Sequence, residues 1–195
     1  MKRLFDFLVS LVGLFFMLIL FFWVPILVKL DSKGSVFFRQ TRVGKGMKPF
    51  TILKFRTMKV ETEHQGWLTV GAKDSRVTKM GYWLRKFKLD ELPQLWNVLV
   101  GEMSLVGPRP EVPKYVAYYT KQQKTVFQVR PGITDEASII FRNESELLAQ
   151  AENTEEFYIK EILPQKLNIG VNYVQRHTFV SDIKIMMRTI NSIFH

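Results

Sequence analysis

The chain has 195 residues, a formal net charge of +10, 16 phenylalanines and 47% hydrophobic residues. This length and hydrophobicity exclude a disordered protein, and the positive charge favours an anionic partner such as nucleic acid, anionic lipid or a phosphorylated small molecule. Because the chain has no cysteine, it has neither disulfides nor thiolate metal sites.

The first predicted element is an apolar segment, Phe7–Val28, which has no charged residue and is long enough for a membrane helix. The alternative is a cleavable signal peptide, but the apolar run is longer than a signal core and no small-residue cleavage site follows it. Basic residues flank the segment on both sides, so the positive-inside rule places the large C-terminal part in the cytoplasm. We therefore expect residues 1–30 to anchor the chain and residues 31–195 to form a cytoplasmic domain.

Pro25 lies inside this segment. Proline removes a backbone donor and disfavours helical geometry at Val24, so we expect the helix to break or kink there. Two topologies follow: a helix that enters the bilayer and returns on the same side, or a kinked helix that spans it. The residues alone leave both open.

The next residues have the pattern of a mixed globular domain. Val36–Gln40 and Phe50–Phe55 are predicted strands of a hairpin around the turn Val43–Gly46. The polar residues 60–75 are typical of a mobile loop, for which a lid is a reasonable role. A helix is predicted over Asp74–Phe87.

A second helix is predicted at LDELPQLWNVL, Leu89–Leu99. At 100° per residue its leucines and Trp96 gather on one side, opposite Asp90, Gln94 and Asn97, with Glu91 at the edge. Because proline fits only the first turn, Asp90 and Glu91 lie at the helix start, where carboxylates often cap. A catalytic role for the acidic pair is the alternative to helix capping. An ionised Asp among cations is a competent nucleophile toward phosphorus, and a neighbouring Glu could hold Mg²⁺.

The rest of the chain is predicted as irregular structure followed by helices. The segment from Gly101 to Pro113 is expected to be irregular, and helices are expected over Pro113–Gln128 and Glu144–Leu163, with a turn at Arg130–Gly132 between them. In the C-terminal helix one face collects Ile183, Met186, Met187, Ile190 and Phe194. Core packing is the default interpretation of this face, and contact with a bilayer surface is the alternative.

Three motifs resemble the bacterial sugar transferase family, the monotopic phosphoglycosyl transferases. They are KFRTM at Lys54–Met58, LRKFKLDELPQLWNVLVGEMSLVGPRPE at Leu84–Glu111 and RPGIT at Arg130–Thr134, in the family's order and approximate spacing. The resemblance implies an α+β, mostly helical fold. It comprises a re-entrant membrane helix broken at Pro25, a small strand hairpin, and amphipathic interfacial helices around a compact catalytic domain. It also implies the cytoplasmic face of the bacterial inner membrane.

The resemblance implies a reaction as well. The family transfers a phospho-sugar from a UDP-sugar to a polyprenyl phosphate, usually undecaprenyl phosphate, and releases UMP. Carried over, Asp90 would attack the β-phosphorus and form a phosphosugar–aspartyl intermediate, and Glu91 would coordinate Mg²⁺. The expected partners are these two substrates and membrane lipids, without nucleic acid, and a homodimer is left open.

Six basic residues are candidate phosphate ligands by the same resemblance: Lys54, Arg56, Arg85, Arg109, Arg130 and Arg142. Arg109 is the strongest candidate because Pro108 and Pro110 restrict its backbone. A structural salt bridge or a lipid-facing charge is the alternative for each of them.

Two positions depart from the family pattern. Val24 replaces the small hydroxylated residue that often precedes the proline. After RPGIT the chain continues with Asp135-Glu136-Ala137-Ser138 instead of a glycine and an aromatic residue. This stretch is interpreted as a capped helix start, with a role in sugar or lipid selectivity as the alternative.

Two other functional classes compete with an enzyme. A membrane-tethered nucleic-acid binder would account for the charge but not for the anchor or the acidic pair. A non-catalytic scaffold has no need of Asp90 and Glu91. Among enzymes, a glycosyltransferase that uses the same donor would release UDP rather than UMP.

Overall fold

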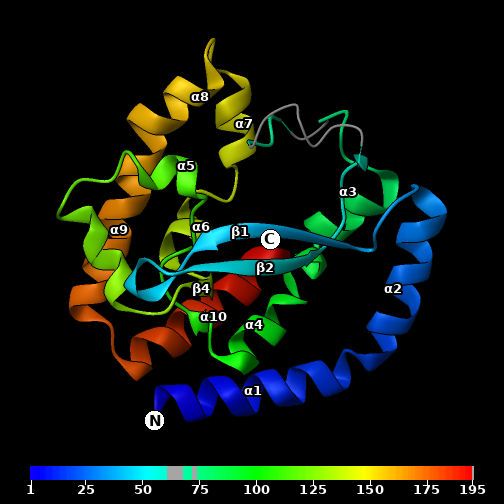
Figure 1. The fold of residues 1–195 in the computed structure, drawn as a ribbon, viewed down its shortest axis with the longest axis horizontal. Coiled ribbons are helices and arrows are strands. Elements are labelled where there is room, and N and C mark those ends of the chain that lie inside the picture. Colours follow the sequence, from blue (N-terminus) through cyan, green and yellow to red (C-terminus); the bar gives the residue numbers. More distant parts are fainter. Residues whose placement is uncertain (61–67, 72–73, 195) are drawn as a thin grey trace.

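The structure is a computed structural model that describes residues 1–60, 68–71 and 74–194 (Figure 1). The fold is α+β and mostly helical, and it contains a strand hairpin, as the sequence predicts. Most of the loop expected over 60–75 lies outside the described residues.

The N-terminal segment forms two helices, α1 (Lys2–Phe16) and α2 (Leu18–Asp31), which meet at an angle of 60°. In Figure 1, α1 runs along the lower edge and α2 rises beside the rest of the chain. In the described part of the chain no single helix is long and apolar enough to cross a membrane, but this bent pair satisfies that test together.

The predicted break at Pro25 is wrong, because the break lies at Met17 and Pro25 lies inside α2. The position of the break follows from packing. Met17 is buried in a core cluster with Leu95 and Val98 of α4 (Gln94–Val100). Gly13 also lies close to α4, since a Cβ at Gly13 would be 3.0 Å from Leu95 Cδ1. Helix α1 therefore follows α4, and the chain turns where Met17 enters the core.

Strands β1 (Phe37–Val43) and β2 (Pro49–Phe55) form the predicted antiparallel hairpin. A short 3₁₀ turn, η1 (Lys45–Met47), connects them. Helix α3 (Lys79–Lys86) begins five residues later than the prediction that it starts at Asp74. The reason is local, because Asp74 accepts hydrogen bonds from Arg76 in a turn and the side chain of Thr78 then caps the helix.

A parallel strand pair was not predicted from the sequence. Strand β3 (Ser104–Val106) pairs with β4 (Gly132–Thr134). Strand β3 lies in the segment expected to be irregular, and β4 begins at the last residue of the predicted turn. A Cβ at Gly132 would lie 2.2 Å from the backbone nitrogen of Gly107, so only glycine permits this approach. The pairing brings the end of the Leu84–Glu111 motif beside RPGIT, because Gly107 donates to the Thr134 carbonyl and Gly132 donates to the Pro108 carbonyl.

The rest of the chain is helical, and the two helices predicted over 113–128 and 144–163 are divided into shorter pieces. The remaining helices are α5 (Pro113–Val116), the 3₁₀ helix η4 (Gln123–Gln128), α6 (Glu136–Ile140), α7 (Glu144–Ala149), α8 (Thr154–Phe157), the π-helical turn η5 (Tyr158–Ile162), α9 (Leu163–Arg176) and α10 (Phe179–Phe194). The predicted continuous helices over 113–128 and 144–163 are wrong because polar side chains bond the backbone. Thr120 and Gln123 bond each other's backbone nitrogens, and Asn153 caps α8.

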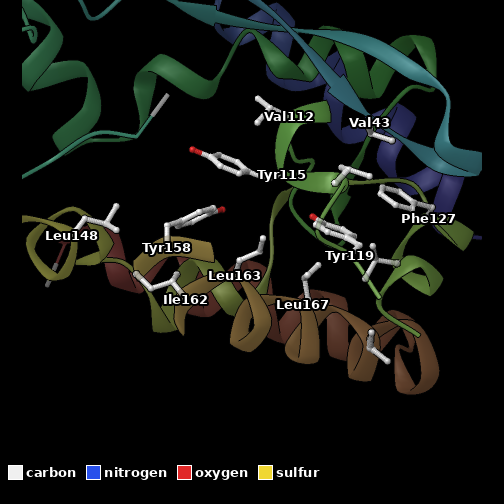
Figure 2. Close-up of a cluster of buried hydrophobic side chains, with 13 residues drawn as sticks. Val43, Val112, Tyr115, Tyr119, Phe127, Leu148, Tyr158, Ile162, Leu163 and Leu167 are labelled. Carbon is white, nitrogen blue, oxygen red and sulfur yellow. The ribbon is translucent and has the colours of Figure 1, made fainter. Parts of the chain in front are cut away.

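One core cluster joins the hairpin to the helices α5, η4 and α9 (Figure 2). In the close-up, Tyr115, Tyr119 and Tyr158 point into the space between these elements. A second core cluster includes buried residues of α4, and side chains of α1 pack against it. The expectation that α10 packs through Met187 and Ile190 is wrong, because both are exposed and Ile185 is buried instead. Buried Asp182 sets this orientation through bonds to Lys2 and Tyr173.

Candidate active site

The acidic pair lies on a tight turn between α3 and α4. Asp90 and Glu91 belong to the 3₁₀ turn η3 (Leu89–Glu91), and Lys88 before it adopts the left-handed region at φ 56°. Neither η3 nor α4 has a side-chain cap hydrogen bond. The capping interpretation therefore does not account for the pair.

Glu91 is held by two cations that approach from different segments. Lys54 of β2 donates to Glu91 Oε1 at 2.7 Å. Arg109, which follows β3, donates through Nη1 to Oε2 at 3.2 Å and through Nη2 to Oε1. Burial alone would raise the pKa of Glu91, but the positive charges of Arg109 and Lys54 hold that pKa well below its usual range. Glu91 is therefore an ionised, fixed carboxylate.

Asp90 has the opposite environment although it is the adjacent residue. Its side chain is buried, with 7% of the residue exposed, and Oδ1 has no hydrogen-bond partner in the described part of the chain. Burial raises the pKa of Asp90, the charge of Glu91 raises it further, and Lys54, Arg85 and Lys88 oppose the rise. A buried carboxylate oxygen without a partner is an oxygen available to react.

The backbone of Arg109 is held by Asp135, which accepts from the Arg109 nitrogen through Oδ2 at 3.1 Å. Its Oδ1 accepts from the Ser138 nitrogen at 2.7 Å and caps α6. The interpretation of Asp135 as a capped helix start is therefore confirmed. The sequence pattern could not show the bond to Arg109, because it joins residues from two segments.

A hydrogen-bond network holds the two residues that follow Arg109, Pro110 and Glu111. Arg42 of β1 donates to Glu111 Oε1 and to the Pro110 carbonyl, both at 3.1 Å. The Tyr158 hydroxyl donates to Glu111 Oε2 at 2.5 Å, and burial raises the pKa of that hydroxyl. Both sides of Arg109 are thus attached to the core.

The other predicted phosphate ligands have different surroundings. Arg85 donates to Thr57 Oγ1 at 2.8 Å and lies close enough for its charge to oppose the raised pKa of Asp90. The Arg56 guanidinium caps the C-terminal end of α2 through the carbonyls of Ser32 and Lys33, both at 2.7 Å. These contacts of Arg56 are structural.

Among the described residues, neither Arg130 nor Arg142 makes a hydrogen bond or ion pair with Asp90 or Glu91. Arg130 Nε donates to the Gly101 carbonyl at 2.7 Å, at the end of α4. Arg142 is exposed after α6. The structure therefore brings Lys54, Arg85 and Arg109 to the carboxylates, and phosphate binding by any of the six basic residues stays a prediction.

The acidic pair fits a magnesium ion only as a site shared with a ligand. In the described ranges no group of three or more His, Cys, Asp or Glu side chains could hold a metal ion by itself. Mg²⁺ is usually bound by one or two carboxylates together with substrate phosphates. The ionised carboxylate of Glu91 is an oxygen donor of this type.

Comparisons with known proteins agree with the motifs. The family model described as bacterial sugar transferase matches residues 1–195. An uncharacterised sugar transferase of Bacillus subtilis, EpsL, is 38% identical over 99% of this chain and 87% of its own. A UDP-glucose:undecaprenyl-phosphate glucose-1-phosphate transferase of Caulobacter vibrioides is 38% identical over 85% of this chain and 59% of its own.

A further relative extends the range of donor sugars. A UDP-N-acetylgalactosamine-undecaprenyl-phosphate N-acetylgalactosaminephosphotransferase of Aeromonas hydrophila is 34% identical over 98% of this chain and 43% of its own. The chain thus spans about half the length of the Caulobacter and Aeromonas proteins and most of the Bacillus protein. The match over the whole chain, together with these relatives, shows that the chain belongs to the bacterial sugar transferase family.

Proposed function

We propose that this protein is a phosphoglycosyl transferase that moves a phospho-sugar from a UDP-sugar to undecaprenyl phosphate and releases UMP. One observation carries the proposal: Asp90 has a buried oxygen without a partner in the described part of the chain, and the adjacent residue is a carboxylate that Lys54 and Arg109 hold in place. The names of the Caulobacter and Aeromonas relatives support this reaction, since both act on undecaprenyl phosphate. Those two names differ in the sugar, so we assign none.

In this proposal Asp90 is the nucleophile. Its carboxylate oxygen attacks the β-phosphorus of the donor, the bond from that phosphorus to the bridging oxygen breaks, and the electron pair leaves with UMP. A phosphate oxygen of undecaprenyl phosphate then attacks the same phosphorus and returns the electron pair to Asp90. The low solvent exposure of Asp90 protects this intermediate from water.

The neighbouring charges prepare the site for a diphosphate. Lys54 and Arg109 hold Glu91 ionised and present positive charge where the donor's phosphates would lie. Glu91, with the diphosphate oxygens, would hold Mg²⁺, which supplies Lewis-acid stabilisation of the leaving UMP. Asp135 and Glu111 keep Arg109 in position from both sides.

We also propose that α1 and α2 dock the enzyme in the cytoplasmic leaflet of the bacterial inner membrane as a re-entrant pair. The polar side chains Asp6 and Ser10 of α1 are buried against the protein, whereas Leu8, Val12 and Phe16 are exposed. A helix with apolar residues outward and polar residues inward is unfavourable in water and favourable in a bilayer.

The function is tested with purified full-length protein in detergent, undecaprenyl phosphate, Mg²⁺ and a panel of UDP-sugars. We expect continuous UMP release only when both substrates are present, and at most about one UMP per protein molecule when undecaprenyl phosphate is left out. Asp90→Asn should release none and should still fold. UDP as the sole nucleotide product would identify a glycosyltransferase instead. No nucleotide release with any donor of the panel would favour a scaffold.

A further inference from the structure

A second polar side-chain atom that is buried and has no partner among the described residues belongs to Gln94, four residues after Asp90 in the sequence. Gln94, the first residue of α4, is only 2% exposed, and its Nε2 has no hydrogen-bond partner among the described residues. Asn97 on the same helix is equally buried but fully bonded, to the Leu53 nitrogen, the Thr51 carbonyl and Glu102. The two amides therefore differ in role: Asn97 joins elements, and Gln94 has a donor to spare.

The sequence position of Gln94 puts this residue about one helical turn from the acidic pair. Gln94 follows Glu91 by three residues and Asp90 by four, spacings that make side chains neighbours on a helical run. Both oxygens of Glu91 already accept hydrogen bonds, from Lys54 and Arg109. On the segment from Asp90 to Gln94, two buried atoms have no partner among the described residues: Asp90 Oδ1, an acceptor, and Gln94 Nε2, a donor.

A buried donor without a partner destabilises the fold, so such a residue is rarely retained for stability alone. A ligand that accepts a hydrogen bond while Asp90 reacts with it would account for both atoms. A phosphoryl group does so, because its phosphorus is the electrophile and its non-bridging oxygens are acceptors. An uncharged amide also has an advantage here, since it can polarise the phosphoryl group without neutralising the nucleophile.

We propose that Gln94 is a catalytic residue whose Nε2 donates a hydrogen bond to a non-bridging oxygen of the transferring phosphoryl group. This inference rests on the proposed function. As Asp90 forms its bond to phosphorus and the bond to the UMP oxygen breaks, charge gathers on the non-bridging oxygens and the hydrogen bond strengthens. The same donor serves the second transfer, in which undecaprenyl phosphate displaces Asp90.

The first test compares Gln94→Met with Gln165→Met. Methionine keeps the length of the side chain and removes the donor. Gln165 is an exposed glutamine on α9 and serves as the matched control. We expect Gln94→Met to lower kcat about 10²-fold to 10³-fold, the usual effect of removing one such donor, without lowering the Tm. Gln165→Met should keep the activity of the unmodified chain.

A second test distinguishes contact with phosphate from support of the fold. The two diastereomers of a UDP-sugar with sulfur at one non-bridging β-oxygen should react at different rates, because sulfur accepts hydrogen bonds poorly. We expect that rate ratio to shrink in Gln94→Met. Gln94→Glu, which places a negative charge at the same position, should be slower than Gln94→Met.

Several outcomes would overturn the inference. A kcat of Gln94→Met within twofold of the unmodified chain, or an unchanged diastereomer ratio, would remove Gln94 from the chemistry. Loss of folding in both Gln94 variants would assign it a structural role. If the unmodified chain releases no UMP, the proposed function fails and this inference fails with it. UMP release by the unmodified chain with a fully active Gln94→Met rejects the inference alone.

Discussion

Two adjacent carboxylates in this site have opposite pKa shifts, and the cause is the placement of two cations. Lys54 and Arg109 bond Glu91 directly and lower its pKa. Asp90 receives no such bond at Oδ1, and burial raises its pKa. Two neighbouring carboxyl groups whose pKa values are shifted in opposite directions are typical of sites in which each group has a different role. Here the free carboxylate is the proposed nucleophile and the bonded one is the proposed metal ligand.

The pKa of Asp90 predicts how activity depends on pH. Only the ionised carboxylate can attack phosphorus, and its raised pKa means that protonation begins above the ordinary aspartate value of about 3.9. We expect kcat/KM for the UDP-sugar to fall as pH decreases, along an acidic limb that lies above this value. Initial rates of UMP release across the pH range measure the limb. A rate that stays constant down to pH values of about 4 would contradict the raised pKa.

Part of this site could be predicted from residues alone. Adjacent Asp90 and Glu91 among cations indicate the chemistry, and Pro108 and Pro110 mark Arg109. Sequence cannot show which groups a guanidinium bonds, so it did not reveal that Arg109 bonds Glu91 whereas Arg56 caps α2. The roles of Asp135 and Gln94 depend on contacts and burial that only the folded chain provides.

At the scale of elements, the site depends on how α4 is attached to β2. Asn97 makes this connection through Leu53 and Thr51 of β2, and its amide also donates to Glu102. Lys54, which donates a hydrogen bond to Glu91, is the next residue after Leu53. The distance between Lys54 and the acidic pair is therefore set by a buried amide on the neighbouring helix.

Loss of this amide should destabilise the fold. We expect Asn97→Leu to lower the free energy of unfolding by about 2 kcal/mol, because it removes three hydrogen bonds of a side chain that is 2% exposed. Asn168→Leu, on the exposed face of α9, should change it by less than about 0.5 kcal/mol. Urea unfolding in detergent measures both. Equal effects of the two variants would contradict the structural role of Asn97.

The hairpin could be predicted because its strands are long enough to show β-type residues around a turn, and the existence of α3 and α4 could be predicted from their patterns. The pair β3 and β4 could not, since strands of three residues that pair across the sequence carry no period. The interruptions near Thr120 and Asn153 depend on side chains that bond the backbone, which apolar periodicity does not reveal.

At the scale of the whole molecule, the N-terminal helices are part of the folded core as well as the proposed membrane contact. Met17, Val24 and Val28 are buried in core clusters shared with β2, α3 and α4. The outer side of α1 and α2 carries exposed apolar residues, among them Phe16, which is 72% exposed. The hydropathy of the sequence predicted an anchor. It could not predict that Asp6 and Ser10 would face inward, because that depends on β3 lying beside α1.

The exposed apolar side of α1 predicts how membrane binding responds to charge. We expect Val12→Asp to reduce binding to vesicles of phosphatidylethanolamine and phosphatidylglycerol about tenfold or more, since aspartate costs about 2.5–3.5 kcal/mol in hydrocarbon. Leu147→Asp is the control, because Leu147 is also exposed but belongs to α7, far from α1 (Figure 1). Vesicle flotation measures the bound fraction. Equal binding of the two variants would contradict docking through α1.

The central claim is that Asp90 becomes covalently bound to the phospho-sugar, and intact-protein mass spectrometry tests it most directly. The full-length protein is incubated with its UDP-sugar and Mg²⁺ without undecaprenyl phosphate, and the adduct is located by peptide mapping. We predict a phospho-sugar adduct on Asp90 that disappears when undecaprenyl phosphate is added and never forms in Asp90→Asn. A protein that releases UMP only with undecaprenyl phosphate present, without passing through this adduct, would contradict the claim.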